Sequence, residues 1–93
     1  KLIDKLSFSP IIEQDDELQV CTVALNEVDL YGESQTLETA IEDLITSIVE
    51  YLTIYMDKVD IFSRVEPELK QVYVLKLLRC NGDREKIRKA IGL

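Results

Sequence analysis

The chain has 93 residues, of which 46% are hydrophobic and 31% are charged, and its formal net charge is −7. These fractions are typical of a globular domain, and the length is sufficient for one hydrophobic core but not for two. The absence of histidine excludes imidazole-based acid–base catalysis and removes the commonest metal ligand. The excess of acids disfavours a nucleic-acid binder that depends on net charge. We therefore expect a single cytoplasmic domain over residues 1–93, without catalytic activity.

The cysteines and the apolar runs also limit the class of protein. Cys21 and Cys80 are too few for a disulfide scaffold and lack the spacing of a zinc site, so we expect two reduced thiols. No apolar run approaches the roughly 20 residues that span a bilayer, and no signal peptide opens the chain. Because the sequence begins at Lys1 rather than at Met, residues upstream are expected to be missing.

Apolar runs separated by turn residues predict a β-hairpin near the N-terminus. The first strand is expected over Ser7–Gln14, with Pro10 at an edge position or a bulge. The polar segment Glu13–Glu17 has turn chemistry, and Leu18–Leu25, rich in β-branched residues, is the second strand. A third short strand is expected over Val28–Gly32.

A long amphipathic helix follows, with Thr36 as its cap and Glu38 in the first turn, where a negative charge suits the helix dipole. Its apolar residues recur every three or four positions as far as Val59, and Val49 and Met56 widen the apolar stripe on one side. The stripe is wide enough to cover a sheet and to leave one flank for another contact.

Two shorter helices complete the expected fold. After a break over Ser63–Glu66, a helix is predicted from Pro67 to Cys80, and Gly82 then ends it. This helix is apolar nearly all round, which predicts burial on two sides, within the fold or against another chain. Asp83 is expected to cap the last helix. The sequence therefore predicts an α+β fold in which a two- or three-stranded antiparallel sheet packs on a long helix, followed by two C-terminal helices.

Charge is distributed unevenly along the sequence. Twelve acids and no base lie between Leu6 and Asp57, whereas seven bases and two acids lie between Leu69 and Leu93. Two interpretations remain open. The two halves attract each other within one fold or across a dimer, or the acidic half binds a basic partner.

No pattern of residues predicts a metal or cofactor site. The acids of Glu13–Glu17 lack the spacing of a calcium loop, which favours a solvated turn. The loop before the long helix is flanked by Glu33 and Glu38, which would repel a phosphate group. The C-terminal bases fit a solvated helix face better than a nucleic-acid site; they are Arg84, Lys86, Arg88 and Lys89. We expect no cofactor and no bound metal.

The order of segments from Phe8 to Leu93 resembles the RelB-like antitoxins of bacterial toxin–antitoxin systems. The resemblance is carried by short motifs: Ile11–Glu13, Val28–Glu33, Thr36–Leu44, Tyr51–Tyr55 and Tyr73–Leu78. The hairpin followed by Gly-Glu-x-x-Thr-x-x-x-Ala is also similar to the HicB-type antitoxin domain. The chain departs from the pattern at Ser34, where a glycine is common, and at Thr39, where a glutamate is common.

The resemblance implies a non-catalytic antitoxin that binds and neutralises a small basic ribonuclease toxin of the RelE type. It also implies that any DNA-binding segment lies upstream or is absent. The surplus of apolar surface on two helices and the acidic run suggest the contact residues. The apolar candidates are Tyr51, Tyr55, Tyr73, Leu77 and Leu78, for which packing in the core is the alternative. Glu42, Asp43 and Glu50 are expected to supply the negative field.

Two other classes of function fit the same layout. One is an enzyme or nucleic-acid binder, which requires a Mg²⁺ site such as Asp29 with Glu33, or a groove formed by the C-terminal bases. The other is a homodimeric interaction module in which the all-round apolar helix packs against its own copy. A homodimer does not exclude an antitoxin.

Overall fold

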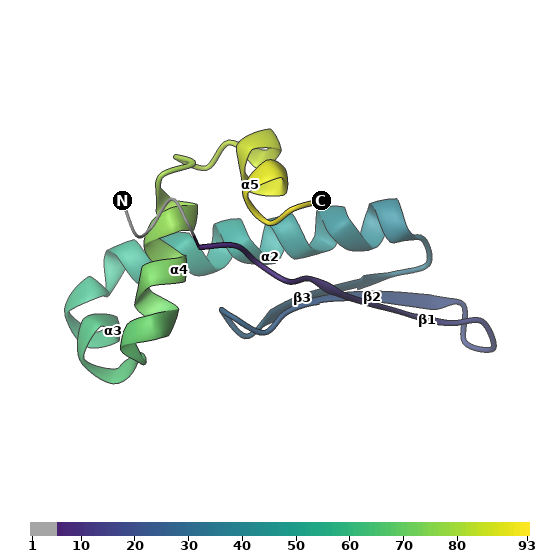
Figure 1. The fold of residues 1–93 in the computed structure, drawn as a ribbon, viewed down its shortest axis with the longest axis horizontal. Coiled ribbons are helices and arrows are strands. Elements are labelled where there is room, and N and C mark those ends of the chain that lie inside the picture. Colours follow the sequence, from purple (N-terminus) through teal and green to yellow (C-terminus); the bar gives the residue numbers. More distant parts are fainter. Residues whose placement is uncertain (1–5) are drawn as a thin grey trace.

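The chain forms an α+β fold, and the computed structural model describes residues 6–93 (Figure 1). Residues 1–5 lie outside the described part, and with them Lys1, on which the expectation of missing upstream residues depends. The elements are β1 Ile11–Asp15, β2 Val20–Leu25, β3 Leu30–Ser34, α2 Leu37–Asp57, α3 Val59–Val65, α4 Glu68–Leu78 and α5 Arg84–Ala90. The predicted fold class is confirmed, with a three-stranded sheet.

The sheet is an antiparallel meander in the order β1-β2-β3. Each of its two turns has a residue with left-handed backbone geometry, Gln19 with φ 51° and Asp29 with φ 56°. In the first turn the Asp15 carboxylate accepts hydrogen bonds from the backbone N–H groups of Glu17 and Leu18, at 3.0 and 3.1 Å. Such Asx contacts stabilise tight turns, which explains the Asp-rich sequence at this end of the hairpin.

All three strands differ from their predicted bounds. The second begins at Val20 rather than Leu18, because Leu18 and Gln19 belong to the turn. The first begins at Ile11 because Phe8 leaves the sheet and packs on Tyr73 of α4, with ring centroids 5.0 Å apart. The third runs from Leu30 to Ser34, because Val28 is buried and Asp29 belongs to the turn. In all three places a tertiary contact or a turn dihedral outweighs the local β propensity.

The long helix α2 covers one face of the sheet, lying mainly over β3 and β2. It begins with a capping box, in which the Thr36 hydroxyl accepts from the Thr39 N–H and the Thr39 hydroxyl accepts from the Thr36 N–H. Thr39 thus performs the role that glutamate usually has in this motif. The core lies between α2 and the inner face of β2, where Cys21, Val23 and Leu25 are buried.

Gly32 allows the helix to approach the sheet closely. A Cβ atom at this position would lie 2.3 Å from the backbone oxygen of Ala40 and 2.3 Å from the backbone nitrogen of Leu44. These are backbone atoms, which cannot move aside by a change of rotamer. The position therefore requires glycine for lack of space rather than for a special φ angle.

The segment after α2 differs from the prediction. The long helix ends at Asp57, and residues 59–65 form the short helix α3, where a break was expected from Ser63. The change of direction at Lys58 brings Phe62 back onto the aromatic side chains of α2. Its ring stacks on Tyr55 at 5.3 Å and lies 6.0 Å from Tyr51. Three helices therefore follow the long one, rather than the two predicted.

The last two helices end and begin largely as predicted. Pro67 is the residue before α4 rather than its first residue, and α4 runs to Leu78. Asn81 and Gly82 both have positive φ, at 53° and 76°. The Asp83 carboxylate caps α5 by accepting from the N–H groups of Glu85 and Lys86. In Figure 1, α5 lies on the side of α2 opposite to the sheet, where its Ile87 is fully buried.

We predict that Gly32→Ala destabilises the fold by about 3 kcal/mol or more, because its Cβ would overlap two backbone atoms. Gly82→Ala is the control, since nothing lies within 4 Å of the place that its Cβ would take and only the positive φ is strained. That change should cost about 1 kcal/mol. Urea unfolding of both variants measures the difference, and equal losses would contradict a steric role for Gly32.

Candidate partner-binding surface

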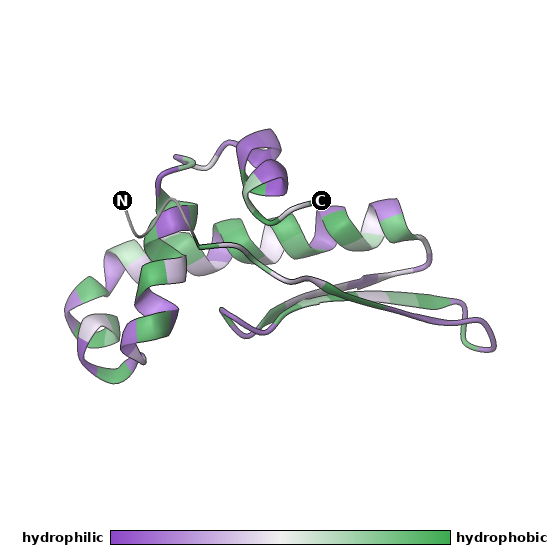
Figure 2. Ribbon diagram, in the orientation of Figure 1, coloured by the Kyte–Doolittle hydropathy of each residue, from purple (hydrophilic) through white to green (hydrophobic). Residues whose placement is uncertain are grey.

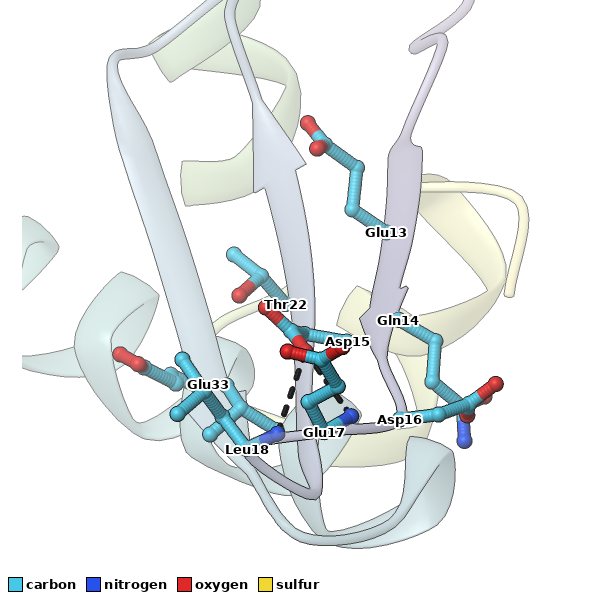
Figure 3. A pocket seen from close by; sticks show the side chains of 9 residues that line it. Glu13, Gln14, Asp15, Asp16, Glu17, Leu18, Thr22 and Glu33 are labelled. Carbon is cyan, nitrogen blue, oxygen red and sulfur yellow. Dashed lines mark hydrogen bonds between the residues drawn. The ribbon is translucent and has the colours of Figure 1, made fainter.

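The strongest accumulation of uncompensated charge is on the outer face of the sheet, opposite to α2. The strand register places Glu13, Thr22 and Glu33 in one row across the three strands, and pairs Asp15 with Val20 in the next. The turn adds Asp16 and Glu17, and together these side chains line a hollow of about 660 Å³. Figure 3 shows the carboxylates around Thr22 and the hydrogen bonds that fix Asp15. We call Glu13, Asp15, Asp16, Glu17 and Glu33 the acidic face.

Within residues 6–93 the acidic face has no ion-pair partner, and all five of its residues are exposed. Five carboxylates on one small surface repel one another and create a negative potential that extends into solvent. An apolar row lies beside them, formed by Ile11, Ala24 and Tyr31. Ile11 is 44% exposed and Tyr31 is 61% exposed. The face thus combines charge with exposed apolar area.

By contrast, the acids at the start of α2 are neutralised within the chain. Arg88 of α5 forms a two-pronged contact with the Glu38 carboxylate, at 2.9 and 2.6 Å. Arg84 bonds the Glu42 carboxylate at 2.9 Å and also donates to the Glu42 carbonyl oxygen. The hydrogen bond from Arg88 holds the pKa of Glu38 below its usual value. For this helix the expected attraction between the two halves of the chain is confirmed.

The other two acids expected to supply the field have different environments. Asp43 accepts a hydrogen bond from the backbone N–H of Glu33, at 2.9 Å, and so binds the free edge of β3. Glu50 is exposed on α2. Of the three acids predicted to supply the field, Glu42 and Asp43 are therefore engaged within the chain, and Glu50 is directed to solvent.

The predicted apolar contact residues divide between core and surface. Tyr55 is 4% exposed and Leu77 is fully buried, so both pack within the single chain. Tyr51, Tyr73 and Leu78 are half-buried. Contact of Tyr55 or Leu77 with a partner remains a prediction, and it requires the elements that cover these side chains to move.

Tyr51 is held by neighbouring side chains. Its hydroxyl donates to Glu66 at 3.4 Å, and the ammonium group of Lys70 lies 5.2 Å from the centre of its ring. Partial burial raises the pKa of Tyr51. Lys70 also forms an ion pair with Glu66 at 3.0 Å. These contacts tie α2 to the turn between α3 and α4 and leave only part of the tyrosine ring accessible.

Leu78 opens onto a mostly apolar groove of about 500 Å³ between α2 and the end of α4. The α2 wall is formed by Val49, Leu52, Thr53 and Met56. Met56 is 58% exposed, so the flank of the helix predicted to remain free is indeed open to solvent. Figure 2 shows hydrophobic segments along both α2 and α4.

The structure does not support the two rival sites. Asp29 lies in the second turn and approaches Lys70 at 3.8 Å, whereas Glu33 lies four residues further, roughly 13 Å along the strand. In the described part of the chain no group of three or more acids or cysteines is placed to hold a metal. Arg84, Arg88 and Lys89 line a hollow of about 350 Å³, but its lining also contains Glu42 and Glu85. Arg84 and Arg88 are paired with α2 carboxylates, so the hollow is not a basic groove. No helix among the described residues is long and apolar enough to cross a membrane.

The sequence interpretation missed the acidic face as a surface. It assigns the acids from Glu13 to Glu17 to a solvated turn, and Glu33 to a helix-capping loop. The available signal was the alternation of β1, which places Glu13 and Asp15 on one side of the strand. The contribution of Glu33 depends on the register of β3. It could not be predicted because the third strand was expected over Val28–Gly32, which does not include Glu33.

The pairing of Glu38 with Arg88 predicts a pH-dependent stability. Because the folded-state pKa of Glu38 is lowered, the pair stabilises the fold above the unfolded-state pKa and is lost as pH falls through the folded-state pKa. Glu38→Gln should therefore lower the melting temperature at pH 7, by a small amount because the pair is exposed, and should have no effect near pH 2. Glu50→Gln is the control, and an equal loss at pH 7 would contradict the assignment.

Comparison with known proteins agrees with this architecture. A crystal structure from Syntrophomonas wolfei subsp. wolfei, described as an antitoxin part of a proposed toxin/antitoxin system, has a TM-score of 0.73 and 18% identity to this chain. The similarity covers 97% of this chain and 64% of that one, so the present chain spans less than two thirds of its length. At this identity the likeness establishes the fold. No curated protein matches significantly.

The family of the chain follows from its sequence over nearly its whole length. The sequence model of the PHD-like family, described as an antitoxin of toxin–antitoxin, RelE / RelB, TA systems, matches residues 1–91. The match includes every strand and helix described above. The chain therefore belongs to the PHD-like family of antitoxins of RelE/RelB toxin–antitoxin systems.

Proposed function

We propose that this antitoxin binds and neutralises a small basic ribonuclease toxin of the RelE type, using the acidic face as its main electrostatic contact. The observation that supports the proposal is the separation of charge within the fold. Bases of α5 neutralise the start of α2, whereas the five carboxylates of the acidic face have no ion-pair partner in residues 6–93. A surface of this kind suits a positively charged protein.

The chemistry of the proposed target explains why such a surface would inhibit it. A ribonuclease binds a polyanion, so its substrate-binding surface carries arginine and lysine side chains. An acidic protein surface competes for the same side chains and is drawn to them over long range. The apolar row beside the acidic face would add buried area, since Ile11 and Tyr31 are exposed in the single chain. Inhibition then needs no catalytic group of the antitoxin.

The groove beside Leu78 is a second element of the proposed contact. Its exposed Met56 offers an adaptable apolar surface. The half-buried Tyr51 and Tyr73 would contribute the accessible parts of their rings. In this proposal Tyr55 and Leu77 support the surface from within the core rather than contacting the toxin.

The direct test uses the product of the neighbouring gene. The two proteins are purified separately, mixed, and assayed for complex formation and for cleavage of a labelled RNA. We expect a stable complex and loss of RNA cleavage at a stoichiometric amount of this chain. Absence of a complex at micromolar concentrations, or cleavage that continues within the complex, would reject the proposed function.

Charge reversal on the acidic face should slow association with that protein. We predict that Glu13→Lys with Glu33→Lys lowers the association rate by about tenfold or more at low salt, because electrostatic steering is lost. The control is Asp60→Lys with Glu68→Lys, which changes net charge equally but lies on α3 and α4, away from the acidic face and from the groove. Stopped-flow binding at two ionic strengths measures both variants. Equal slowing would show that net charge, and not the acidic face, directs the encounter.

Self-association is a second candidate property, favoured by apolar side chains on α3 and α4. Ile61 is 57% exposed, Val65 is 68% exposed and Leu69 is 66% exposed. An exposed cluster of this kind is typical of surfaces that bind protein. Analytical ultracentrifugation of the purified chain tests the homodimer, and Val65→Ser with Leu69→Ser should shift a dimer to monomer.

A further inference from the structure

The two outer strands of the sheet differ in how their free edges are protected. On β3, the Asp43 side chain of α2 accepts a hydrogen bond from the backbone N–H of Glu33, at 2.9 Å. This contact occupies a backbone donor at the edge and places a helix side chain beside the strand. Within residues 6–93 no comparable side-chain contact is found on the edge of β1, whose five residues are all exposed.

The same hydrogen bond shows which backbone groups of β1 face solvent, because it gives the direction of the Glu33 N–H in the sheet. Because the N–H of Glu33 points away from β2, its partner Thr22 directs its backbone groups toward β1 and Glu13. Backbone groups alternate along an antiparallel strand, so those of Ile12 and Gln14 point to the free edge. These two residues present unpaired donors and acceptors in the spacing that a further strand requires.

The space beside β1 is open on both faces of the sheet. The helix α2 packs on β3 and β2, which leaves Ile12 48% exposed although it is on the helix side. On the other side, Ile11 is 44% exposed and is followed by the carboxylates of Glu13 and Asp15. An added strand would therefore bury two isoleucines and place its own side chains beside two acids.

The charges decide which strand fits. In the antiparallel register centred on Glu13, a second copy of β1 would bring Glu13 opposite Glu13 and diagonal to Asp15, which destabilises a sheet. A strand with lysine or arginine on one face, flanked by apolar residues, would instead place opposite charges beside Glu13 and Asp15. The edge of β1 thus disfavours a second copy of this chain and favours a basic partner.

We propose that β1 is the docking edge for an extended basic segment of the toxin, which adds to the sheet as a fourth strand beside Ile12 and Gln14. This inference rests on the proposed function and specifies how the toxin is held. The backbone of the segment pairs with Ile12 and Gln14, and its basic side chains lie beside Glu13 and Asp15. The main-chain bonds supply affinity, and the alternating side chains supply selectivity.

Hydrogen exchange of the isotopically labelled chain tests this arrangement with the neighbouring gene's product as the probe. We expect exchange of the Ile12 and Gln14 amides to slow at least tenfold in the complex. The Glu13 amide, which faces β2, should be protected already in the free chain, and the Tyr31 amide at the other edge should not change. Unchanged exchange at Ile12 and Gln14 in a formed complex would overturn the docking edge but leave the antitoxin function intact.

Proline substitution provides an independent test. Gln14→Pro removes the outward N–H without removing a bond to β2, and should weaken binding about tenfold or more. Gln14→Ala retains the N–H and should bind within about twofold of the original chain. Circular dichroism and thermal melting verify the fold of both variants. Equal affinity of the two folded variants would overturn the proposal.

The outcomes separate the possible explanations. If the neighbouring protein forms no complex with the original chain, the proposed function fails and the docking edge fails with it. If the Ile12 and Gln14 amides become protected in the chain alone as its concentration rises, a second copy occupies the edge. That result would contradict the charge argument and overturn the proposal.

Discussion

The contact between the backbone of β3 at Gly32 and the backbone of α2 at Ala40 and Leu44 is the constraint on which the rest of the structure depends. It brings the helix close to β3, so that the helix lies over β3 and β2 and its buried residues close the core. A helix held over one side of a narrow sheet leaves the other outer strand uncovered. The exposure of β1 is therefore a consequence of the same contact that builds the core.

The position of α2 also determines where charge remains. Its acids face two neighbours: Arg84 and Arg88 of α5 neutralise Glu42 and Glu38, and Asp43 binds the edge of β3. The strand carboxylates point away from α2 and lie beyond the reach of α5. Five carboxylates without an ion-pair partner in residues 6–93 thus lie together on the acidic face, while Glu50 and Asp57 are exposed on α2. Folding brings acids of β1, of the first turn and of β3 together on one surface.

The sequence predicted the parts of the fold that depend on local chemistry. Thr36 and Asp83 cap their helices and Gly82 takes positive φ, because capping and backbone dihedrals are set by one or two residues. The sequence-based prediction failed where contacts between residues distant in the sequence determine the bounds of an element. The helix α3 exists because Phe62 packs on Tyr55, and the first strand begins late because Phe8 packs on Tyr73. Neither contact leaves a periodic signal in the sequence.

The same distinction applies to the candidate site. The alternation of β1 contained half of the acidic face, but the row that joins Glu13 to Glu33 exists only in the register of three strands. Conversely, the tyrosines and leucines predicted to contact a partner include Tyr55 and Leu77, which are buried in the core. The number of apolar residues in a sequence indicates how large the core can be. Only the packing shows which of these residues are buried and which remain exposed.

The hydrogen bond from Glu33 to Asp43 has a consequence for assembly on a larger scale. A sheet with two open edges can add subunits at both ends and so grow into a filament. Here a helix side chain occupies one backbone donor at the β3 edge, and the β1 edge carries charges of one sign. Strand addition at β1 is therefore favoured over addition at β3, and a basic strand bound there would extend the sheet from one side.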